Sequence, residues 1–367
     1  MRDTKAKLIE INYRYEALKD LNELLNLRRV SDHLLQHLTR HFAIYSYGFA
    51  MFTCNESRHA IHYRIFNKRT SKLSLPFKQH KEIKALRPEF ILVHGISNYF
   101  QVMHLKLILG KQTKILVQHH GERPLGLIKR SLLKLSALAV DAFLFTSQET
   151  ARQLSIPQRK LFLLMEGSTD FKQKNKTEAR LKLKLPEEGL IYIWVGRLIP
   201  VKNPLFLLEE VVVFLKERPS AYLYLMYHDE TLLEECRKLT KGLSNVKYLG
   251  RVPHQELNDW FSAADYFVSA SLHEGSGYAL CEAMACGCIP IVPSIGAFQF
   301  MTGNGACGLM YESGSRKSLQ KVLSKSWVLD KSEAQKKVSD QFKNHLSFGA
   351  IADTLFSITC ALNKINK

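Results

Sequence analysis

The chain has 367 residues, of which 46% are hydrophobic and 23% are charged. This balance is typical of a globular protein and excludes a disordered or fibrous one, and the length favours two domains with separate cores. No apolar run approaches the roughly 20 residues of a membrane-spanning helix, and the first residues lack the apolar stretch of a signal peptide. We therefore expect a cytoplasmic protein.

The charge is unevenly distributed along the chain. Lys and Arg number 52 and Asp and Glu number 34, which gives a net charge of +18. Residues 1–175 hold 29 basic and 14 acidic residues, so they carry +15 of that charge. Such a field attracts an anionic membrane, a nucleic acid or a polyanionic substrate.

The seven cysteines are an odd number in a chain without a secretory signal, which argues against a disulfide framework. Cys281, Cys286 and Cys288 are close together, but their spacing fits no zinc pattern. We expect them to pack in the core as small apolar side chains.

In chain order, short apolar runs alternate with segments of helical periodicity, which predicts parallel sheets. The predicted strands of the first half are residues 7–12, 42–47, 90–94, 114–118, 141–145 and 161–165. A lysine-rich stretch, residues 172–188, follows and is predicted to be a linker with a surface helix. The predicted strands of the second half are residues 190–195, 221–226, 246–249, 266–269 and 289–292. Helices are expected between the strands, including residues 278–286, and amphipathic residues 348–363 predict a last helix. The pattern indicates an α/β protein with two doubly wound domains.

The first segment that carries chemistry is residues 191–204, IYIWVGRLIPVKNP. An apolar strand stops at Gly196 and places Arg197 and Lys202 in the loop before a helix that we expect to begin near Asn203. Arg offers a planar fork, Lys a point charge, and a helix start unpaired N–H groups, all of which suit a diphosphate. The alternative is a basic surface loop that caps a helix.

The second segment is residues 269–293, SASLHEGSGYALCEAMACGCIPIVP. Its order is strand, glycine-containing loop, helix and strand. Gly275 and Gly277 let the backbone approach a ligand closely, and the helix after them would direct its N-terminus at an anion. Glu274 and Glu282 can border one cleft and accept hydrogen bonds from sugar hydroxyls. The alternative is that Glu282 forms a salt bridge on its helix and Glu274 is solvated.

Together, the two segments resemble a known family. The spacing E-x7-E in HEGSGYALCEAMACG, downstream of a strand that ends in GRL with a lysine five residues beyond the arginine, is similar to the family-4-type retaining glycosyltransferases, glycosyl transferases group 1. The resemblance is specific over residues 191–311, including RVPHQELNDWFSAADYFVSAS and GLMY. It extends more faintly to ILVHGIS, to His119-His120-Gly121 and to DAFLFTSQETARQL in the first half.

The resemblance implies a GT-B fold, in which two Rossmann-like doubly wound domains face each other across a cleft. Residues 1–172 would form the acceptor-binding domain and residues 173–347 the nucleotide-sugar-binding domain. Residues 348–367 would form a helix that crosses back to the first domain.

The resemblance also implies a role for each matching residue. Arg197 and Lys202, after Gly196, would hold the donor diphosphate and neutralise its charge as it leaves. Glu282 would accept hydrogen bonds from the ribose hydroxyls. Glu274 would contact the transferred sugar, together with backbone N–H groups around Gly275, Ser276 and Gly277. His120 matches a position that reaches across the cleft toward the sugar, with His119 as the alternative.

Preorganised cations lower the barrier to loss of a diphosphate, and no DxD-type acidic pair lies near the phosphate segments. We therefore expect no metal and no cofactor other than the nucleotide-sugar donor. The implied reaction is retaining transfer of a hexose or N-acetylhexosamine, with UDP favoured over GDP on family frequency. In this scheme the leaving phosphate helps to deprotonate the acceptor.

Three segments depart from the family pattern. Residues 11–27 contain no glycine where a glycine-rich loop is usual. Residues 166–170, EGSTD, replace N-G-V-D, and residues 227–229, YHD, replace a glycine-rich turn. The first departure puts contacts from that loop to the acceptor and the diphosphate in doubt.

Residues 125–138 and 34–42 mix basic and apolar residues at helical spacing, so either segment could rest on an anionic bilayer or be an ordinary surface helix. With the charge of +15, we expect peripheral association with the inner face of the cell membrane. The expected acceptor is a lipid-linked or cell-surface glycan of cell-envelope polysaccharide biosynthesis.

Two other classes of protein stay open. A GT-B protein can be a sugar-nucleotide epimerase or a non-catalytic binding subunit. The charge alone would also fit a nucleic-acid-binding protein, but the basic residues lack the interleaved aromatics of such a module, so we expect no specific nucleic acid as a partner.

Overall fold

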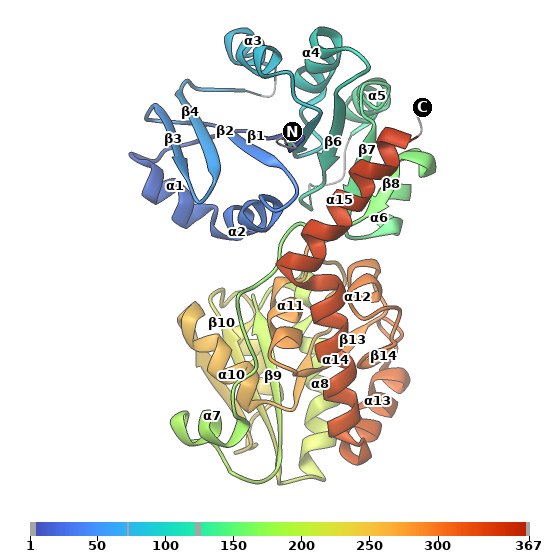
Figure 1. Cartoon of the computed structure of the whole chain (residues 1–367). Coiled ribbons are helices and arrows are strands. Elements are labelled where there is room, and N and C mark those ends of the chain that lie inside the picture. The colour runs from blue at the N-terminus through green and yellow to red at the C-terminus, as the bar shows by residue number, and fades with distance from the viewer. Residues whose placement is uncertain (1–4, 72, 122–125, 365–367) are drawn as a thin grey trace. The chain divides into compact units, whose positions relative to one another are not determined.

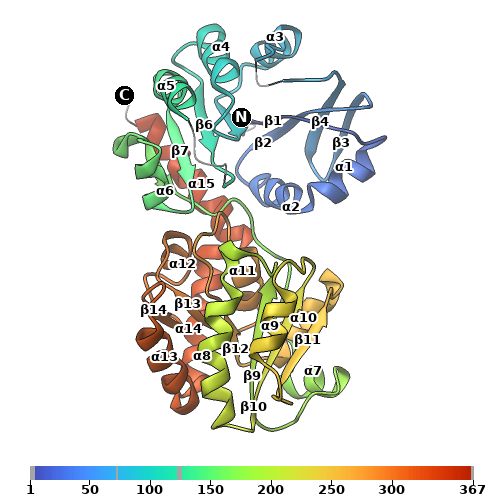
Figure 2. The same cartoon turned by 180° about the vertical axis from the view of Figure 1, so that it is seen from behind.

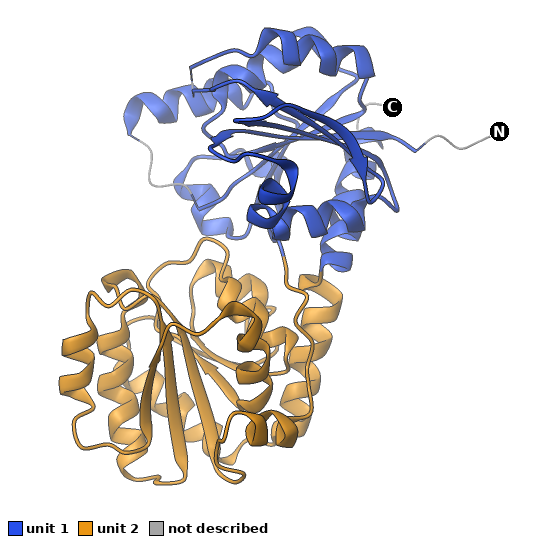
Figure 3. Cartoon of the chain, turned by 90° about the vertical axis from the view of Figure 1, so that its left-hand side faces the viewer, with its two compact units in different colours: residues 1–167, 348–367 blue, residues 168–347 orange. Residues whose placement is uncertain are grey.

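The computed structural model describes residues 5–71, 73–121 and 126–364 (Figure 1). The chain divides into two compact units (Figure 3). Unit 1 is Met1–Gly167 together with Phe348–Lys367, and unit 2 is Ser168–Ser347. Each unit has its own sheet and its own core.

The sheet of unit 1 has eight strands over the described residues, in the order β3-β4-β2-β1-β5-β6-β7-β8. All neighbours pair in parallel except β3 and β4. The strands are β1 (Lys7–Glu16), β2 (Ala43–Ala50), β3 (Cys54–Arg58), β4 (Ile61–Asn67), β5 (Phe90–His94), β6 (Lys114–Gln118), β7 (Ala142–Phe145) and β8 (Leu161–Leu163). The six strands predicted for the first half are confirmed.

The helices of unit 1 connect these strands (Figure 1). They are α1 (Leu21–Leu27), α2 (Arg29–Leu38), α3 (Phe77–Leu86), α4 (Tyr99–Leu109), α5 (Leu127–Ser136), α6 (Gln148–Gln153), the short η1 (Gln158–Lys160) and α15 (Phe348–Lys364). The last helix, α15, packs against α2. Arg40, just after α2, pairs with Asp353 of α15 at 2.6 Å. Helix α2 ends at Leu38, so the helix predicted over residues 34–42 is wrong in its bounds. Its apolar side chains are buried within the unit.

The antiparallel hairpin of β3 and β4 was not predicted. Its two-residue turn is His59-Ala60, with φ of 48° and 63°. Hairpin turns with two positive φ angles usually contain Asn-Gly or Asp-Gly, so the sequence lacks the signal. The first strand also runs beyond its predicted end, to Glu16, after an irregularity between Ile11 and Tyr15.

The sheet of unit 2 has six parallel strands over the described residues, in the order β11-β10-β9-β12-β13-β14. Counted along this unit, the order is 3-2-1-4-5-6, the Rossmann order. The strands are β9 (Leu190–Gly196), β10 (Ala221–Tyr227), β11 (Val246–Gly250), β12 (Tyr266–Val268), β13 (Ile289–Pro293) and β14 (Leu309–Tyr311). The five predicted strands are confirmed, and β14 was missed because it has only three residues.

Helices cover both faces of this sheet, with α8 and α9 nearer the viewer in Figure 2 and α10 and α14 nearer in Figure 1. The helices are α7 (Lys176–Lys182), η2 (Pro200–Lys202), α8 (Pro204–Lys216), α9 (Leu233–Leu239), η3 (His254–Glu256), α10 (Leu257–Ala263), α11 (Tyr278–Ala285), α12 (Gly296–Met301), α13 (Arg316–Val328), α14 (Lys331–Gln341) and η4 (Phe342–Leu346).

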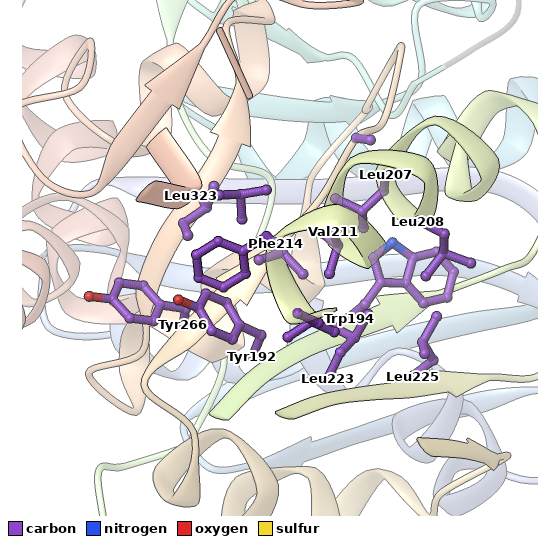
Figure 4. Close-up of a cluster of buried hydrophobic side chains, with 14 of the residues drawn as sticks. Tyr192, Trp194, Leu207, Leu208, Val211, Phe214, Leu223, Leu225, Tyr266 and Leu323 are labelled. Carbon is purple, nitrogen blue, oxygen red and sulfur yellow. The ribbon is translucent and has the colours of Figure 1, made fainter. Parts of the chain in front are cut away.

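The core of unit 2 explains why these elements form. Strands β9 and β10 are almost wholly apolar, as expected for parallel strands buried on both faces. Figure 4 shows Leu207, Val211 and Phe214 of α8 gathered with Trp194 of β9 and Leu223 of β10. The spacing of the three helix residues places them on one face of α8.

The division between the units falls at Gly167, five residues before the boundary expected at residue 172. The intervening segment packs on unit 2. Phe171 lies 6.4 Å from Phe261, ring centre to ring centre, and the backbone N–H of Lys174 donates to Ser262. The stretch predicted as a linker is therefore part of the second fold, and its helix is α7.

Within the described residues, no single helix is long and apolar enough to cross a membrane, and only the bent pair Lys331–Leu346 and Phe348–Lys364 meets that test of length and composition together.

The seven cysteines are free, and all but Cys54 and Cys360 are buried. Burial raises the pKa of the Cys281 thiol to about 12, and that of Cys286 to about 12. These thiols are protonated core side chains, as expected from the sequence.

Candidate functional site

The candidate site of unit 2 lies where its strand order reverses. Strands β9 and β12 are parallel neighbours, and β10 and β13 continue the sheet in opposite directions from them. In an open α/β sheet this switch point leaves a crevice at the carboxyl ends of the strands. The loops that follow β9 and β12 are the two segments that carry the predicted residues.

The two loops are joined directly. The Lys202 ammonium lies 2.6 Å from the Glu274 carboxylate, and the two side chains are 20% and 13% exposed. The backbone N–H of Leu272 donates to the carbonyl of Val201 at 2.9 Å. The structure therefore brings Lys202 and Glu274 together, although the sequence assigned them to different parts of a ligand.

Arg197 follows Gly196, the last residue of β9, and is exposed. The N–H of Leu198 donates to the carbonyl of Asp229, so this loop lies beside the turn after β10. Hydrogen bonds from Thr231, and to a smaller extent the charge of Arg197, lower the pKa of Asp229. Arg197 thus lies at the carboxyl end of β9 with a carboxylate nearby.

Two helices begin at the same edge of the sheet. Helix α8 begins at Pro204, after Asn203 in a left-handed conformation, and α11 begins at Tyr278, after Gly277 with φ of 65°. Neither Asn203 nor Gly277 makes a side-chain cap. A helix start of this kind binds anions through its backbone N–H groups. Helix α11 ends at Ala285, one residue before its predicted end.

Gly275 and Ser276 are partly buried in the loop before α11, and Gly277 is buried. A Cβ atom at Gly277 would lie 3.0 Å from the Met301 sulfur and 3.3 Å from the Phe298 ring. The turn therefore requires glycine for both its conformation and its space.

Glu282 is buried in α11, and its Oε1 lies 2.6 Å from Nε2 of His254 in η3. The His254 side chain is 54% exposed, and its ring lies 5.0 Å from that of Phe171. His254 was not singled out in the sequence. Its place in the loop after β11, at the same edge of the sheet, is the signal that could have found it.

The candidate of unit 1 follows strand β6. His119 is buried, with its ring stacked on Phe145 at 4.6 Å. The side chain of His120 is 33% exposed, so His120 is the histidine of this pair that a ligand can reach. Its Nε2 lies 2.8 Å from Nδ1 of His94, and its Nδ1 bonds to the Glu166 carboxylate. Neither partner was predicted for His120, although both lie in segments compared with the family pattern.

His120 belongs to unit 1 and the other candidates to unit 2, so the structure describes them as two separate groups. No group of three or more His, Cys, Asp or Glu residues in the described parts of the chain could hold a metal ion.

Comparison with known proteins gives the strongest sequence matches in the second unit. Residues 175–345 match the model of the family glycosyl transferases group 1. A D-inositol 3-phosphate glycosyltransferase of Streptomyces avermitilis is 29% identical over 161 residues, which cover 40% of this chain and 34% of that protein. One from Thermobispora bispora is 24% identical over 236 residues, 60% of this chain and 53% of that protein. The chain thus aligns with only about a third to a half of these curated relatives.

Solved structures resemble the whole chain. A sucrose-phosphate synthase from Thermosynechococcus elongatus has a TM-score of 0.69 at 18% identity, over 98% of this chain and 100% of that one. A trehalose-6-phosphate protein from E. coli bound with UDP-2-fluoro glucose has a TM-score of 0.68 at 12% identity, over 96% and 99% of the two chains. At these identities the likeness shows the fold. The fold is GT-B, and residues 175–345 of the chain form a domain of the glycosyl transferases group 1 family.

Proposed function

We propose that the protein is a metal-independent, retaining glycosyltransferase that takes a hexose or N-acetylhexosamine from a nucleoside diphosphate sugar, UDP more readily than GDP. The acceptor that we propose is a lipid-linked or cell-surface glycan. The observation that carries the proposal is the pair of Lys202 and Glu274 at the switch point of a Rossmann-ordered sheet, which joins the loop that holds Arg197 to the loop before α11.

The diphosphate binds between the loop after β9 and the start of α11. Arg197 and Lys202 supply the positive charge, and the helix supplies N–H groups. In the structure, Lys202 is paired with Glu274. A diphosphate that binds Lys202 therefore competes for it and leaves Glu274 able to accept a hydrogen bond from a sugar hydroxyl.

The ribose binds to Glu282. This carboxylate is buried and already accepts a hydrogen bond from His254, so its orientation is fixed before a ligand arrives. A preoriented carboxylate loses little conformational entropy on binding. His254, with a half-exposed ring at the same position, is a further ligand contact in this proposal.

The reaction needs negative charge to be stabilised on the departing diphosphate. Arg197 and Lys202 are fixed cations at that place, and such preorganised charges commonly lower a barrier by about 3–4 kcal/mol each. This electrostatic role is one that a divalent ion fills in other transferases.

A panel of nucleotide sugars in a thermal-shift assay tests the binding site. A ligand at 100 times its dissociation constant stabilises the protein by about 2.7 kcal/mol. We expect a UDP-sugar to raise the melting temperature of the parent protein, and Arg197→Ala and Glu282→Ala each to abolish that rise without lowering the melting temperature of the ligand-free protein.

Arg159→Ala is the control, because Arg159 is an exposed arginine of η1 in the other unit. It should keep the full ligand shift. If Arg197→Ala and Glu282→Ala keep the shift as well, the nucleotide binds elsewhere and the proposed site is wrong.

An epimerase or a non-catalytic subunit of the same fold would bind the same donor. Time-resolved NMR with the donor alone separates these functions from a transferase. Slow release of free sugar with retained anomeric configuration supports the transferase, whereas a new epimer supports the epimerase. Binding with no turnover, also after acceptor glycans are added, supports the subunit.

A further inference from the structure

A line of polar side chains crosses the sheet of unit 1, and the family resemblance implies a role for only one of them, His120. It runs from Ser46 on β2 through Glu10 on β1 and His94 on β5 to His120 after β6, and ends at Glu166 after β8. Strands β2, β1, β5 and β6 are successive neighbours, so the line runs across the strands. Glu10 and Ser46 are direct partners in the strand register.

Each member of this line contacts the next through a hydrogen bond or an ion pair. Ser46 Oγ donates to Glu10 Oε2 at 2.7 Å. Glu10 Oε1 lies 2.8 Å from His94 Nε2, and His94 Nδ1 lies 2.8 Å from His120 Nε2. His120 Nδ1 bonds to Glu166 Oε2. Both nitrogens of both rings therefore lie within 3 Å of a polar atom of the line.

Most side chains of the line are buried, which raises the free energy of any charged group among them. Glu10 is 2% exposed, and Glu166 and His94 are also buried. Burial by itself would raise the pKa of Glu10, but His94, Arg28 and the Ser46 hydroxyl outweigh it and hold the pKa below its ordinary value. Glu10 is thus an anion in the core, a state that proteins keep only where a partner compensates the charge.

The contacts of the line determine how many ring protons His94 and His120 carry together. An ion-pair contact of 2.8 Å links Glu10 to His94, and two hydrogen bonds link His94 to His120 and His120 to Glu166. Each of these three contacts needs one proton between its two heavy atoms, because two lone pairs repel at so short a distance. Two neutral imidazoles carry one ring proton each, so they supply two of the three. With both carboxylates ionised, the third proton makes one of the rings an imidazolium, and it can lie on either side of the bond between His94 and His120.

We propose that Glu10, His94 and Glu166 are positioning residues for His120, which lock its ring at both nitrogens and keep one extra proton shared between the two histidines. The part that concerns sugar transfer rests on the proposed function and on the contact with the transferred sugar that the family resemblance implies for His120. The locked ring then meets the sugar in one orientation, instead of exchanging a proton with it.

The ring protons can be counted without any ligand. We use nitrogen-detected NMR of the histidine side chains in the full-length protein at pH 7, with His94→Gln and His120→Gln for assignment. The expected count is three N–H protons over His94 and His120. Glu166→Gln removes one anion but keeps a side chain that can hydrogen-bond, so it should lower the count to two, and Glu10→Gln should do the same.

Glu210→Gln is the matched control, since Glu210 is a buried glutamate that pairs with Arg316 in unit 2. It should leave the count at three. A count of two in the parent protein, or an unchanged count in Glu166→Gln, overturns the shared proton. Because Glu166 is in a loop at the end of the line, Glu166→Gln gives an answer even if Glu10→Gln does not fold.

A double-variant cycle tests the positioning of His120 in catalysis. Glu166→Gln should lower kcat/KM about tenfold, and Glu166→Gln with His120→Ala should be no slower than His120→Ala alone, because residues that act as a unit are not additive. Additive losses would refute the positioning role. If no transferase activity is found at all, the proposed function is wrong. The proton count still shows whether His94 and His120 share an extra proton.

Discussion

Gly277 shows how one residue sets the geometry of the nucleotide site. Its φ of 65° is a conformation that L side chains rarely adopt, and a Cβ there would meet Met301 and Phe298 at 3.0 and 3.3 Å. We expect Gly277→Ala to destabilise the protein by about 1–3 kcal/mol. It should also weaken nucleotide binding, because the start of α11 must shift. Urea unfolding and the nucleotide thermal shift measure the two effects.

Gly242→Ala is the control that separates backbone strain from steric crowding around the new Cβ atom. Gly242 has φ of 86°, but a Cβ there meets nothing within 4 Å. Gly242→Ala should therefore lose stability through its backbone alone and keep full nucleotide binding. Equal binding by the Gly277→Ala protein would show that the start of α11 does not contact the ligand.

Single residues of the site differ in how far the sequence predicts them. Arg197, Lys202 and Glu274 could be placed because they follow predicted strands, and strand ends locate ligand sites in this class of fold. The ion pair of Lys202 with Glu274 could not be predicted, nor could the pairing of His120 with Glu166. These partners lie 72 and 46 residues apart, and no periodicity relates residues at such distances.

At the scale of elements, helix α7 shows that a polar, charged segment can contain a buried side chain. Its lysine-rich composition predicts a linker with a surface helix, yet Arg180 within it is 5% exposed. The guanidinium donates to Asp265 at 2.8 Å and to the carbonyl of Ala263 at 3.0 Å. Asp265 in turn accepts from the N–H of Ile191, at the second residue of β9. One buried pair thus joins α7 to two central strands.

Arg180→Met should destabilise the protein by about 3 kcal/mol, because it removes the more buried of the two cations that pair with the buried Asp265 carboxylate, Arg180 and Lys176. Chemical unfolding at pH 7 measures the loss. Lys182→Met is the control on the same helix, since Lys182 is exposed and pairs with Asp259; it should unfold like the parent protein. If both variants behave alike, α7 is the surface helix that its composition indicates.

The same scale explains the other errors. Strands of parallel sheets are long apolar runs, which is why eleven predicted strands are present. The β3–β4 hairpin has a half-exposed, charged first strand, CNESR, and a turn without glycine or asparagine. Neither feature signals a strand. The physical cause of that hairpin lies in its pairing with β2 and not in its own sequence.

At the scale of the whole molecule, the charge of the chain is concentrated in one unit. By sequence, unit 1 holds 29 basic and 14 acidic residues, whereas unit 2 holds 23 and 20. Helix α5 of unit 1 adds exposed apolar side chains, since Leu127 is 83% and Ile128 80% exposed. The predicted segment began at residue 125, which lies outside the described residues. Basic and apolar groups together favour binding to an anionic bilayer.

We expect the protein to bind vesicles that contain anionic lipid at low salt and to dissociate at about 0.5 M salt, where charges are screened beyond a few ångströms. Replacing Leu127 and Ile128 by Ser should weaken binding roughly tenfold, because each side chain gives up part of its transfer free energy. Replacing the similarly exposed Leu181 and Val328 of unit 2 by Ser removes as much apolar surface from the nearly neutral unit and should change nothing. Vesicle sedimentation measures all three proteins. If the Leu127 and Ile128 variant binds as well as the parent protein, α5 does not touch the bilayer. If the parent protein does not bind, the positive charge of unit 1 serves to attract the acceptor and not a membrane.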